Sequence, residues 1–304
     1  GFQEELTRVR ILDPACGSGN FLYVALAKLL DLEKEVLVYG ATNGLSLGYP
    51  LVAPRQLLGL EVNEYARELA QVVVWIGYLQ WRLGNGFLGL PEPILEPLET
   101  IRLQDALLDR SEPGKPKEAA WPEADIIIGN PPFLGGKRLR TELGDAYVAD
   151  LFAVYDGRVP READLVCYFF EKARAEIAAG RAKRAGLLAT NSIRGGANRK
   201  VLERIKETGD IFLAWDDEPW ILDGAAVRIS IVGFDDSALA QLPQVGLTSM
   251  THPKQEAGRL AAHLLLSQID GSLPTERRFY AFHPELVIRN SCRPLAAGVP
   301  TSAS

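Results

Sequence analysis

The sequence has few cysteines and histidines and no long apolar run. Its 304 residues include three cysteines, Cys16, Cys167 and Cys292, which form no CxxC pair, and three histidines, all in the last fifth of the chain. This argues against a zinc site or a disulfide framework and is typical of a reducing cytoplasm. Apolar stretches such as 21–30 are too short to cross a bilayer, and residues 1–10 lack a signal-peptide pattern. We expect a soluble cytoplasmic protein without a membrane partner or a metal in this chain.

An excess of positive charge is also lacking. The chain has 33 Lys and Arg against 39 Asp and Glu, a net charge of −6, which argues weakly against nucleic acid. The distribution says otherwise, because residues 181–204 hold seven basic residues against one acid, Glu203, and a shorter basic cluster contains Lys137, Arg138 and Arg140. A local patch can bind phosphates on an acidic chain. A solvated helix face would explain each cluster equally well.

Short apolar runs alternate with segments of helical periodicity from residue 9 to residue 235. The strands predicted from this pattern are 9–13, 57–61, 99–103, 125–129, 186–190, 211–215 and 227–234. The predicted helices are 20 to about 36, a helix capped by Asn63, 165 to about 179, and 198–208. The helix after Asn63 is expected to place on one face Ala66, Leu69, Ala70, Val73, Ile76 and Gly77. The alternation predicts an α/β fold with a mainly parallel seven-stranded sheet covered by helices on both faces. The last two strands have too short a connection for a crossover helix, so we expect one of them to be antiparallel.

Three segments do not follow the alternation. Residues 37–56 and 110–122 are rich in Gly, Pro and polar residues and are predicted to be loops. From about 236 the pattern weakens, and the tail 295–304 is predicted to be disordered.

A glycine-rich corner, Asp13-Pro14-Ala15-Cys16-Gly17-Ser18-Gly19, lies between the first predicted strand and helix. In an open α/β sheet this position binds nucleotide-like ligands. The dinucleotide fingerprint would need a third glycine where Leu22 stands, and no Gly-Lys-Ser/Thr follows as in a phosphate-binding P-loop. Two glycines alone favour a plain tight turn.

Carboxylates at the same sheet edge change that balance. Glu61 ends the second predicted strand, and Asp105 lies two residues beyond the third. An acid at the end of the second strand is where an adenosine ribose is bound through its hydroxyls. Together with Asp13, these groups would form an acidic rim, which suits a positively charged sulfonium cofactor better than an anionic dinucleotide.

A second corner, Asn130-Pro131-Pro132-Phe133, follows the fourth predicted strand and should face the same crevice. Asn130 supplies a carbonyl acceptor, the prolines hold the backbone rigid, and Phe133 offers a flat face. Two acceptors beside an aromatic ring suit a planar base that carries an NH₂ group, and such a base must first leave the duplex. Taken alone, two prolines that merely end a strand are an equally good interpretation.

The order of these motifs resembles a known family. "DPACGSGNF", Glu61, "QDAL" and "NPPF" are similar to the motif series of adenine-specific, S-adenosylmethionine-dependent DNA methyltransferases of the gamma class. The insert at 37–56 and the downstream "ADLVCYFFEKA", "GLLATNSIRGG" and "DEPWILDGAAVRISIVGF" resemble single-chain restriction-modification enzymes of types IIG and IIL. The resemblance covers about residues 9–235 and implies the class I, Rossmann-like methyltransferase fold.

The resemblance implies roles for the first corner and its neighbours. Asp13, Ala15 and Gly17 would surround the methionine part of S-adenosylmethionine, Glu61 would bind the ribose, and Asp105 the adenine amine. Cys16 is interpreted as a packing residue rather than a nucleophile. The full set expected at the cofactor is Asp13, Pro14, Ala15, Cys16, Gly17, Gly19, Asn20, Glu61, Asp105 and Ala106.

For the second corner, the resemblance implies that Asn130 and the Pro131 carbonyl hold the target amine while Phe133 stacks on the base. The expected catalytic residues are Asn130, Pro131, Pro132 and Phe133. Asp164 would line the target pocket and Arg194 would contact the DNA backbone. The expected DNA-binding residues are Lys137, Arg138, Asp164 and Arg194, with double-stranded DNA as the partner.

The sequence departs from the family at both ends. Only eight residues precede Val9, where the family has a further cofactor-binding segment, and 236–304 is too short for a complete target-recognition domain. We therefore expect a catalytic domain over 1–235, a linker or the start of a recognition domain over 236–304, and further domains in a larger polypeptide.

The sequence also bears on other chemistries. Methylation of a cytosine carbon needs a Cys after a Pro, and none of the three cysteines has one. Methylation of the exocyclic cytosine amine usually has Ser in place of Asn130. The same corner could act on a protein glutamine or on RNA, and an incomplete fragment could bind DNA or cofactor without turnover.

Overall fold

The computed structural model describes residues 1–44, 48–87, 97–222, 225–237, 249–251 and 285–287. The chain divides into two compact units, Gly1–Gln241 and Leu242–Ser304. In the second unit, the described residues form an antiparallel pair, β10 (Ser249–Thr251) and β11 (Glu285–Val287). Most of 236–304, including the tail predicted to be disordered, lies outside the described residues. All the residues proposed for the site lie in the first unit.

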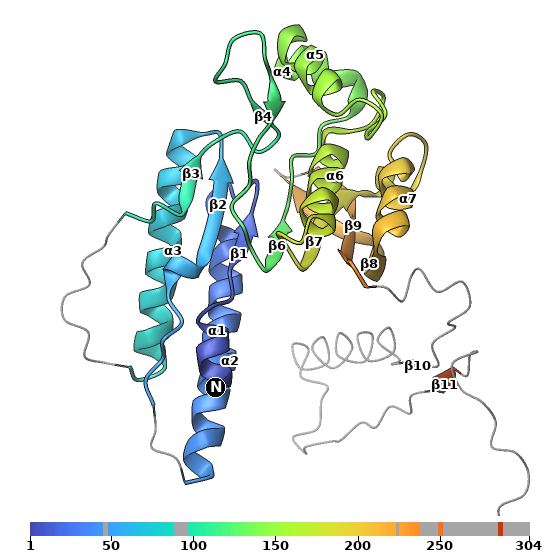
Figure 1. The fold of residues 1–304 in the computed structure, drawn as a ribbon. Helices are drawn as coiled ribbons and strands as arrows, with labels where there is room; N and C mark the ends of the chain where they lie inside the picture. Colours follow the sequence, from blue (N-terminus) through green and yellow to red (C-terminus); the bar gives the residue numbers. More distant parts are fainter. Residues whose placement is uncertain (45–47, 88–96, 223–224, 238–248, 252–284, 288–304) are drawn as a thin grey trace, which may run out of the picture. The chain divides into compact units, whose positions relative to one another are not determined.

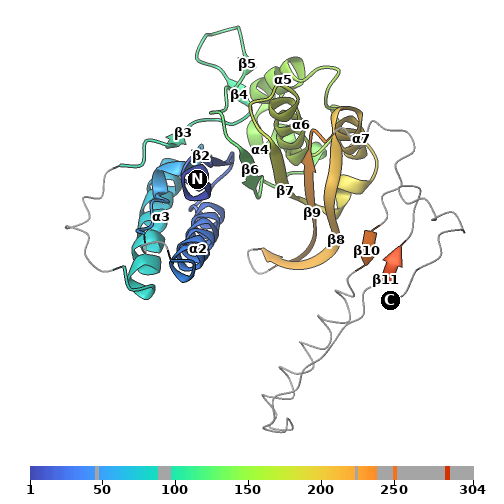
Figure 2. The ribbon, with the colours of Figure 1, turned by 60° about the horizontal axis from the view of Figure 1, so that its bottom comes forward.

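The first unit is built on one seven-stranded sheet with the order β3-β2-β1-β6-β7-β9-β8 (Figures 1 and 2). Neighbouring strands are parallel, except that β9 is antiparallel to both β7 and β8. The predicted sheet and its single antiparallel strand are confirmed. The strands are β1 (Ile11–Asp13), β2 (Leu57–Glu61), β3 (Ile101–Leu103), β6 (Ile126–Gly129), β7 (Arg184–Thr190), β8 (Asp210–Leu222) and β9 (Ala225–Asp235).

Helices cover both faces of the sheet. Alternate residues along β1 and β2 point to opposite faces and pack in two different apolar clusters. Ile11 and Leu57 pack with α2 and α3, whereas Leu12 and Leu58 belong to the cluster that contains α6. The helices are α1 (Phe2–Leu6), α2 (Asn20–Thr42), α3 (Glu64–Gly84), α4 (Leu139–Leu143), α5 (Asp145–Val154), α6 (Leu165–Ala178) and α7 (Arg199–Thr208). Short 3₁₀ turns are η1 (Pro54–Gln56), η2 (Gly136–Arg138) and η3 (Asn191–Arg194), and a small hairpin joins β4 (Leu108–Asp109) to β5 (Lys117–Glu118).

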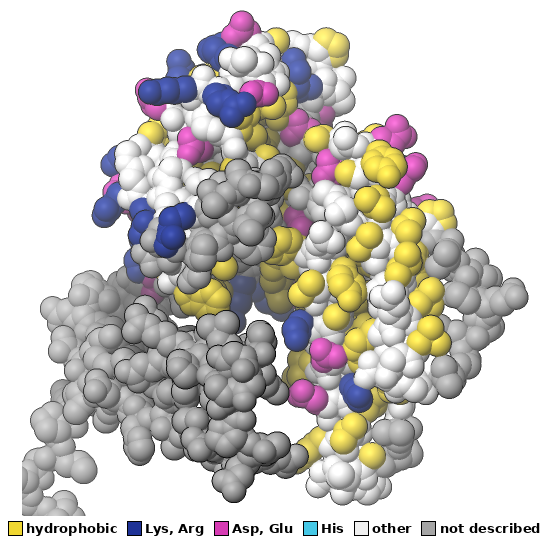
Figure 3. Space-filling view, turned by 180° about the vertical axis from the view of Figure 1, so that it is seen from behind, with side chains coloured by type: hydrophobic (Ala, Val, Ile, Leu, Met, Phe, Trp, Pro, Cys, Tyr) yellow, Lys and Arg dark blue, Asp and Glu magenta, His cyan; other side chains and the backbone are white. Residues whose placement is uncertain are grey.

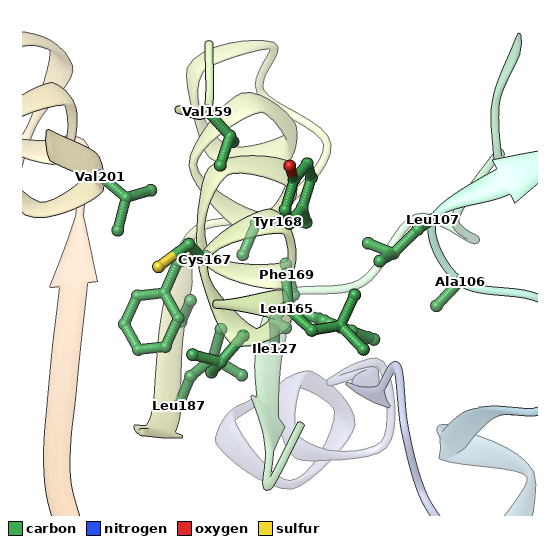
Figure 4. Close-up of a cluster of buried hydrophobic side chains, with 14 of the residues drawn as sticks. Ala106, Leu107, Ile127, Val159, Leu165, Cys167, Tyr168, Phe169, Leu187 and Val201 are labelled. Atoms are coloured by element: carbon green, nitrogen blue, oxygen red, sulfur yellow. The ribbon is translucent and has the colours of Figure 1, made fainter. Parts of the chain in front are cut away.

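The most buried helix is α6, which fills the larger apolar cluster. Tyr168 and Phe170 are fully buried, and Leu165 and Phe169 lie on the side of α6 toward Leu107 (Figure 4). This packing fixes the start of α6 beside the ends of β1, β6 and β7, where the two predicted corners lie. No helix in the described ranges is long and apolar enough to span a bilayer.

Two local predictions were wrong, and a third was right only in part. Helix α2 continues to Thr42, six residues into the predicted loop, because Leu37 keeps the buried face going. The predicted loop 110–122 contains β5, with Trp121 buried behind it. In α3 the predicted Ala70 and Gly77 are buried, but Leu69 and Ile76 are 37% and 48% exposed. Val74 and Tyr78 are buried in their place. The predicted cap does form, since the Asn63 side chain accepts from the Ala66 N–H.

Candidate active site

A pocket of about 470 Å³ lies at the carboxyl ends of β1, β2 and β6. The order of the strands reverses between β1 and β6, and open α/β sheets bind ligands at this switch point. The pocket brings both predicted corners together. Its lining is Pro14, Ala15, Leu60, Glu61, Val62, Gln104, Asp105, Ala106, Leu107, Asn130, Pro132, Leu143, Tyr147, Leu165 and Phe169.

The glycine loop after β1 turns back onto the end of β2. The Cys16 N–H donates to the Leu60 carbonyl over 3.1 Å, and the Gly17 N–H donates to Glu61 Oε2 over 2.9 Å. Gly17 has a φ of +52° and open space around it. Gly19, with a φ of +83°, serves packing instead, since a Cβ there would lie 3.0 Å from the Ala70 Cα of α3.

Glu61 joins the loop to the helix that follows it. Oε1 accepts from the Val62 and Asn63 N–H groups over 2.9 and 2.8 Å, and Oε2 accepts from Gly17. The carboxylate therefore has three backbone donors and still forms part of the pocket wall. Asn20, also expected at the cofactor, is exposed at the first position of α2.

Asp13 lies behind the pocket rather than in its wall. Its side chain is 1% exposed, and Oδ1 accepts from the Ala15 N–H over 3.0 Å. Gly129 packs against this carboxyl, because a Cβ on Gly129 would lie 2.7 Å from Asp13 Oδ1. Burial raises the pKa of Asp13 from 3.8 to about 7, with the charge of Glu61 adding to it and the bond from Ala15 opposing it. Asp13 thus links the ends of β1 and β6.

Cys16 packs into the apolar cluster under the loop. It is 6% exposed, and a Cβ on Gly59 of β2 would lie 2.9 Å from its Sγ. Burial, with the charges of Asp13 and Glu61, raises the pKa of this thiol far above its ordinary value. The thiol therefore stays protonated, which does not suit a nucleophile.

The segment after β3 is held from both sides. Asp105 Oδ1 accepts from the Leu107 and Leu108 N–H groups over 2.8 and 3.2 Å, and Trp121 Nε1 donates to the Ala106 carbonyl over 2.7 Å. Tyr147 of α5, which the sequence did not indicate, lines the pocket beside them. Burial raises the pKa of Tyr147, and the charge of Asp105 and its hydrogen bond to Tyr147 raise it further.

Sequence reasoning missed the far wall of the pocket. Leu143, Tyr147 and Phe169 come from α4, α5 and α6. Leu143 and Tyr147 were missed because no short motif marks α4 or α5 and neither helix was predicted. Phe169 lies within the "ADLVCYFFEKA" segment, where helical spacing from Leu165 could have placed it on the same face.

Asn130 presents an unpaired acceptor to the pocket. Its Oδ1 is buried and accepts no hydrogen bond from any described residue. A buried polar atom without a partner is rare and costs stability, so it calls for a ligand or another explanation. Pro132 also lines the pocket, whereas Pro131 and Phe133 complete the corner outside the lining, with Phe133 partly buried.

The residues expected at DNA do not enter the pocket wall. Lys137 and Arg138 are exposed on η2, directly after the corner, and Arg194 is exposed on η3. Arg138 pairs with Glu142, whereas Lys137 makes no ion pair within the described ranges. Figure 3 shows Lys and Arg side chains gathered near α4 and α5. Asp164 precedes α6, where Gly136, Ser192 and Asn198 donate to it.

The larger basic cluster is mostly neutralised by ion pairs. Six of the seven basic side chains counted over 181–204 form ion pairs: Arg181 with Glu176, Lys183 with Asp125, Arg184 with Asp235, and Arg204 with Glu171, while Arg199 and Lys200 share Glu203. Most of this cluster therefore has the character of a paired surface.

Two family models match the chain. A family model described as MmeI, DNA-methyltransferase domain, matches residues 1–243, and a model of a periplasmic binding protein-like domain matches residues 227–292. The arabinose metabolism transcriptional repressor of Geobacillus stearothermophilus is 36% identical over 105 residues, which cover 31% of this chain and 29% of the repressor.

Two further relatives match most of the chain. DNA methyltransferase A of Bacillus subtilis (strain 168) is 29% identical over 238 residues, which cover 75% of this chain and 26% of that protein. The structure of the Type IIL restriction-modification enzyme MmeI in complex with DNA has a TM-score of 0.60 at 26% identity, covering 78% of this chain and 32% of that chain. The match thus spans between a quarter and a third of the length of these two proteins.

Proposed function

The chain belongs to the MmeI DNA-methyltransferase domain family, and on that premise we propose that it methylates adenine N6 in DNA. The methyl donor is S-adenosylmethionine, and the reaction is part of a restriction-modification or phage-defence enzyme. The observation that carries the proposal is the buried Oδ1 of Asn130 in the pocket wall, which accepts no hydrogen bond from the part of the chain that the structure describes. This acceptor suits an exocyclic amine, which brings the two N–H donors that the corner lacks.

The pocket suits the proposed cofactor. Glu61 faces it with a carboxylate that three backbone N–H groups hold in place, and Asp105 also lines it. Apolar side chains, Leu60, Val62 and Leu107, offer surfaces for an adenine ring. When bound, S-adenosylmethionine supplies an electrophilic methyl group, and its sulfur keeps the S–C bonding electrons when the target nitrogen takes that group.

The second corner would prepare the target amine. A base flipped out of the duplex would donate its amine protons to Asn130 Oδ1 and to the Pro131 carbonyl, with Phe133 stacked on the ring. Both bonds draw the nitrogen lone pair out of the ring, so the amine becomes nucleophilic and needs no strong base. The surplus proton then passes to solvent. The buried, protonated Cys16 takes no part.

Transfer of a labelled methyl group tests this function. The protein is incubated with methyl-labelled S-adenosylmethionine and duplex DNA, ribosomal RNA or a protein mixture, and labelled products are identified by mass spectrometry after digestion. We expect label in DNA as N6-methyladenine. Label as N4-methylcytosine, in RNA, or on protein glutamine would contradict the proposal. Each result would instead identify the cytosine amine, RNA or the glutamine side chain as the substrate.

Calorimetry with S-adenosylmethionine distinguishes an enzyme from a binding module. Cofactor binding without label in any acceptor would favour a domain that has kept the fold and lost turnover. No measurable binding would favour an inert fragment.

A further inference from the structure

The loop after the Asn-Pro-Pro-Phe corner lies directly on the chain that leads into α6. The Leu165 N–H donates to the Leu134 carbonyl over 2.8 Å, and the Gly136 N–H donates to Asp164 Oδ1 over 3.0 Å. At Gly136 the contact is backbone to backbone, since a Cβ there would lie 2.3 Å from the Glu162 carbonyl oxygen. The backbone at Gly136 therefore lies closer to the backbone of Glu162 than any side chain at position 136 would allow.

The other oxygen of Asp164 holds the loop after β7. Asp164 Oδ2 accepts from Ser192 Oγ and from Asn198 Nδ2, both over 2.7 Å. Asn198 returns the contact, because its Oδ1 accepts from the Asp164 N–H over 2.8 Å. Asn198 is only 7% exposed, and Ser192 also contacts Thr190 Oγ1 at 2.6 Å. One carboxylate thus joins three segments that are far apart in the sequence.

We propose that Asp164 is a positioning residue, which holds the Asn-Pro-Pro-Phe corner and the loop that carries Arg194 at a fixed separation. The inference rests on the proposed function. Asp164 has three donors from its own chain and does not line the pocket, whereas its neighbour Leu165 does. Its carboxylate is committed to Gly136, Ser192 and Asn198, so it acts on the target base through the corner and not by contact.

This arrangement gives the loop after β7 a defined task. Ser192 and Arg194 lie in the same 3₁₀ turn, and Asn198 directly precedes α7. A DNA backbone bound at this turn would then stand in a fixed position relative to Asn130, where the flipped base must arrive. Misplacement of reacting groups by about 1 Å costs on the order of 100-fold in rate.

Neighbouring glycines provide a matched test. At Gly136, alanine must push the loop away from Glu162, whereas at Gly135, where φ is −65°, the nearest atom to a Cβ is Asp164 Oδ1 at an ordinary 3.7 Å. We expect Gly136→Ala to lower kcat about 10–100-fold, with the Kd of S-adenosylmethionine within threefold of wild type. Gly135→Ala should stay within about twofold on both measures. A folded Gly136→Ala protein with wild-type kcat would overturn the proposal.

Asp164 variants test the carboxylate itself. Asp164→Ala should lower kcat as Gly136→Ala does and reduce the fluorescence of 2-aminopurine placed at the target position, whereas Asp164→Asn, which keeps one acceptor, should recover part of both. Direct contact with the base would instead make Asp164→Ala change the choice of base and leave Gly136→Ala active, which would contradict a positioning role.

Hydrogen exchange separates this inference from the proposed function. In Asp164→Ala the amides of Gly136 and Leu165 should exchange faster than in wild type, while those of α2 do not change. This readout needs no turnover. Absence of methylation by the wild-type protein would therefore refute the proposed function. Unchanged exchange at Gly136 would refute the positioning role of Asp164.

Discussion

The two sides of the pocket treat their oxygen acceptors in opposite ways. On the side of β2, Glu61 already accepts from three backbone N–H groups before any ligand binds. On the side of β6, Asn130 Oδ1 is buried and accepts from none of the described residues. The first acceptor is held rigid by its own chain, and the second lacks a donor that a ligand could bring.

The difference suggests a division of labour. A pre-bonded carboxylate loses little on binding a cofactor, because its orientation is already fixed. An unpaired buried acceptor costs folding free energy that a ligand amine could recover only by donating to it. The β2 side would therefore serve affinity, and the β6 side would serve the reacting group.

The largest expected effect comes from removing the acceptor on the β6 side of the pocket. Asn130→Ala should lower kcat for DNA methylation by about 10²–10³-fold, the contribution of one preorganised hydrogen-bonding group. Cofactor binding measured by calorimetry should stay within about threefold, because Asn130 is not expected to hold the cofactor. Asn85→Ala, at the remote end of α3, serves as the control. Retained turnover in Asn130→Ala would sink the assignment.

The next largest effect comes from changing the carboxylate on the β2 side of the pocket. Glu61→Gln replaces one acceptor oxygen by a donor, which should weaken S-adenosylmethionine binding by about 10–100-fold, since hydrogen bonds to charged groups contribute about 1.5–3 kcal/mol. The measurement is calorimetric, with the exposed Glu68→Gln on α3 as the matched control. Unchanged affinity in Glu61→Gln would place the cofactor elsewhere.

A smaller effect concerns the carboxyl behind both sides. The folded protein raises the pKa of Asp13 from 3.8 to about 7, so the folded state binds the proton more tightly than the unfolded state. The contribution of Asp13 to stability is therefore full below about pH 4 and falls as the pH rises toward 7. Asp13→Asn cannot ionise and should gain stability relative to wild type between pH 5 and 8, by on the order of 2 kcal/mol. Denaturant melts across this range would show it, and a pH-independent difference would contradict it.

The smallest effect extends the comparison outside the pocket. Lys137→Ala together with Arg138→Ala should weaken DNA binding, because each phosphate contact releases counterions. The slope of log Kd against log salt should fall by about 1, mainly through Lys137, because Arg138 already pairs with Glu142. Lys200→Ala, whose cation already pairs with Glu203, should leave the slope nearly unchanged. Equal slopes in all three proteins would mean that residues 137 and 138 form only a solvated face.

The strands and their alternation with helices could be predicted because their signals are local. The run Leu57 to Glu61 is apolar, ends in an acid and is followed by the Asn63 cap, and the structure has β2 and α3 there. The end of α2 was predicted too early because the glycine and asparagine in 37–44 suggest a loop. The helix continues to Thr42 because burial of Leu37 favours it. The buried face of α3 was predicted only in part, because valine and isoleucine occur on several of its faces.

The sequence by itself determined the alternation of strands and helices and the two corners at one sheet edge, because strand direction and side-chain period follow from local patterns. Only the tertiary structure decided that Glu61 faces the pocket while Asp13 lies buried behind it, and that no donor among the described residues reaches Asn130 Oδ1. It also decided that the basic residues around 181–204 are largely paired and that Asp164 joins three segments. Burial and pairing depend on which distant segments meet, and a carboxylate carries no mark in the sequence of the partner that it will find.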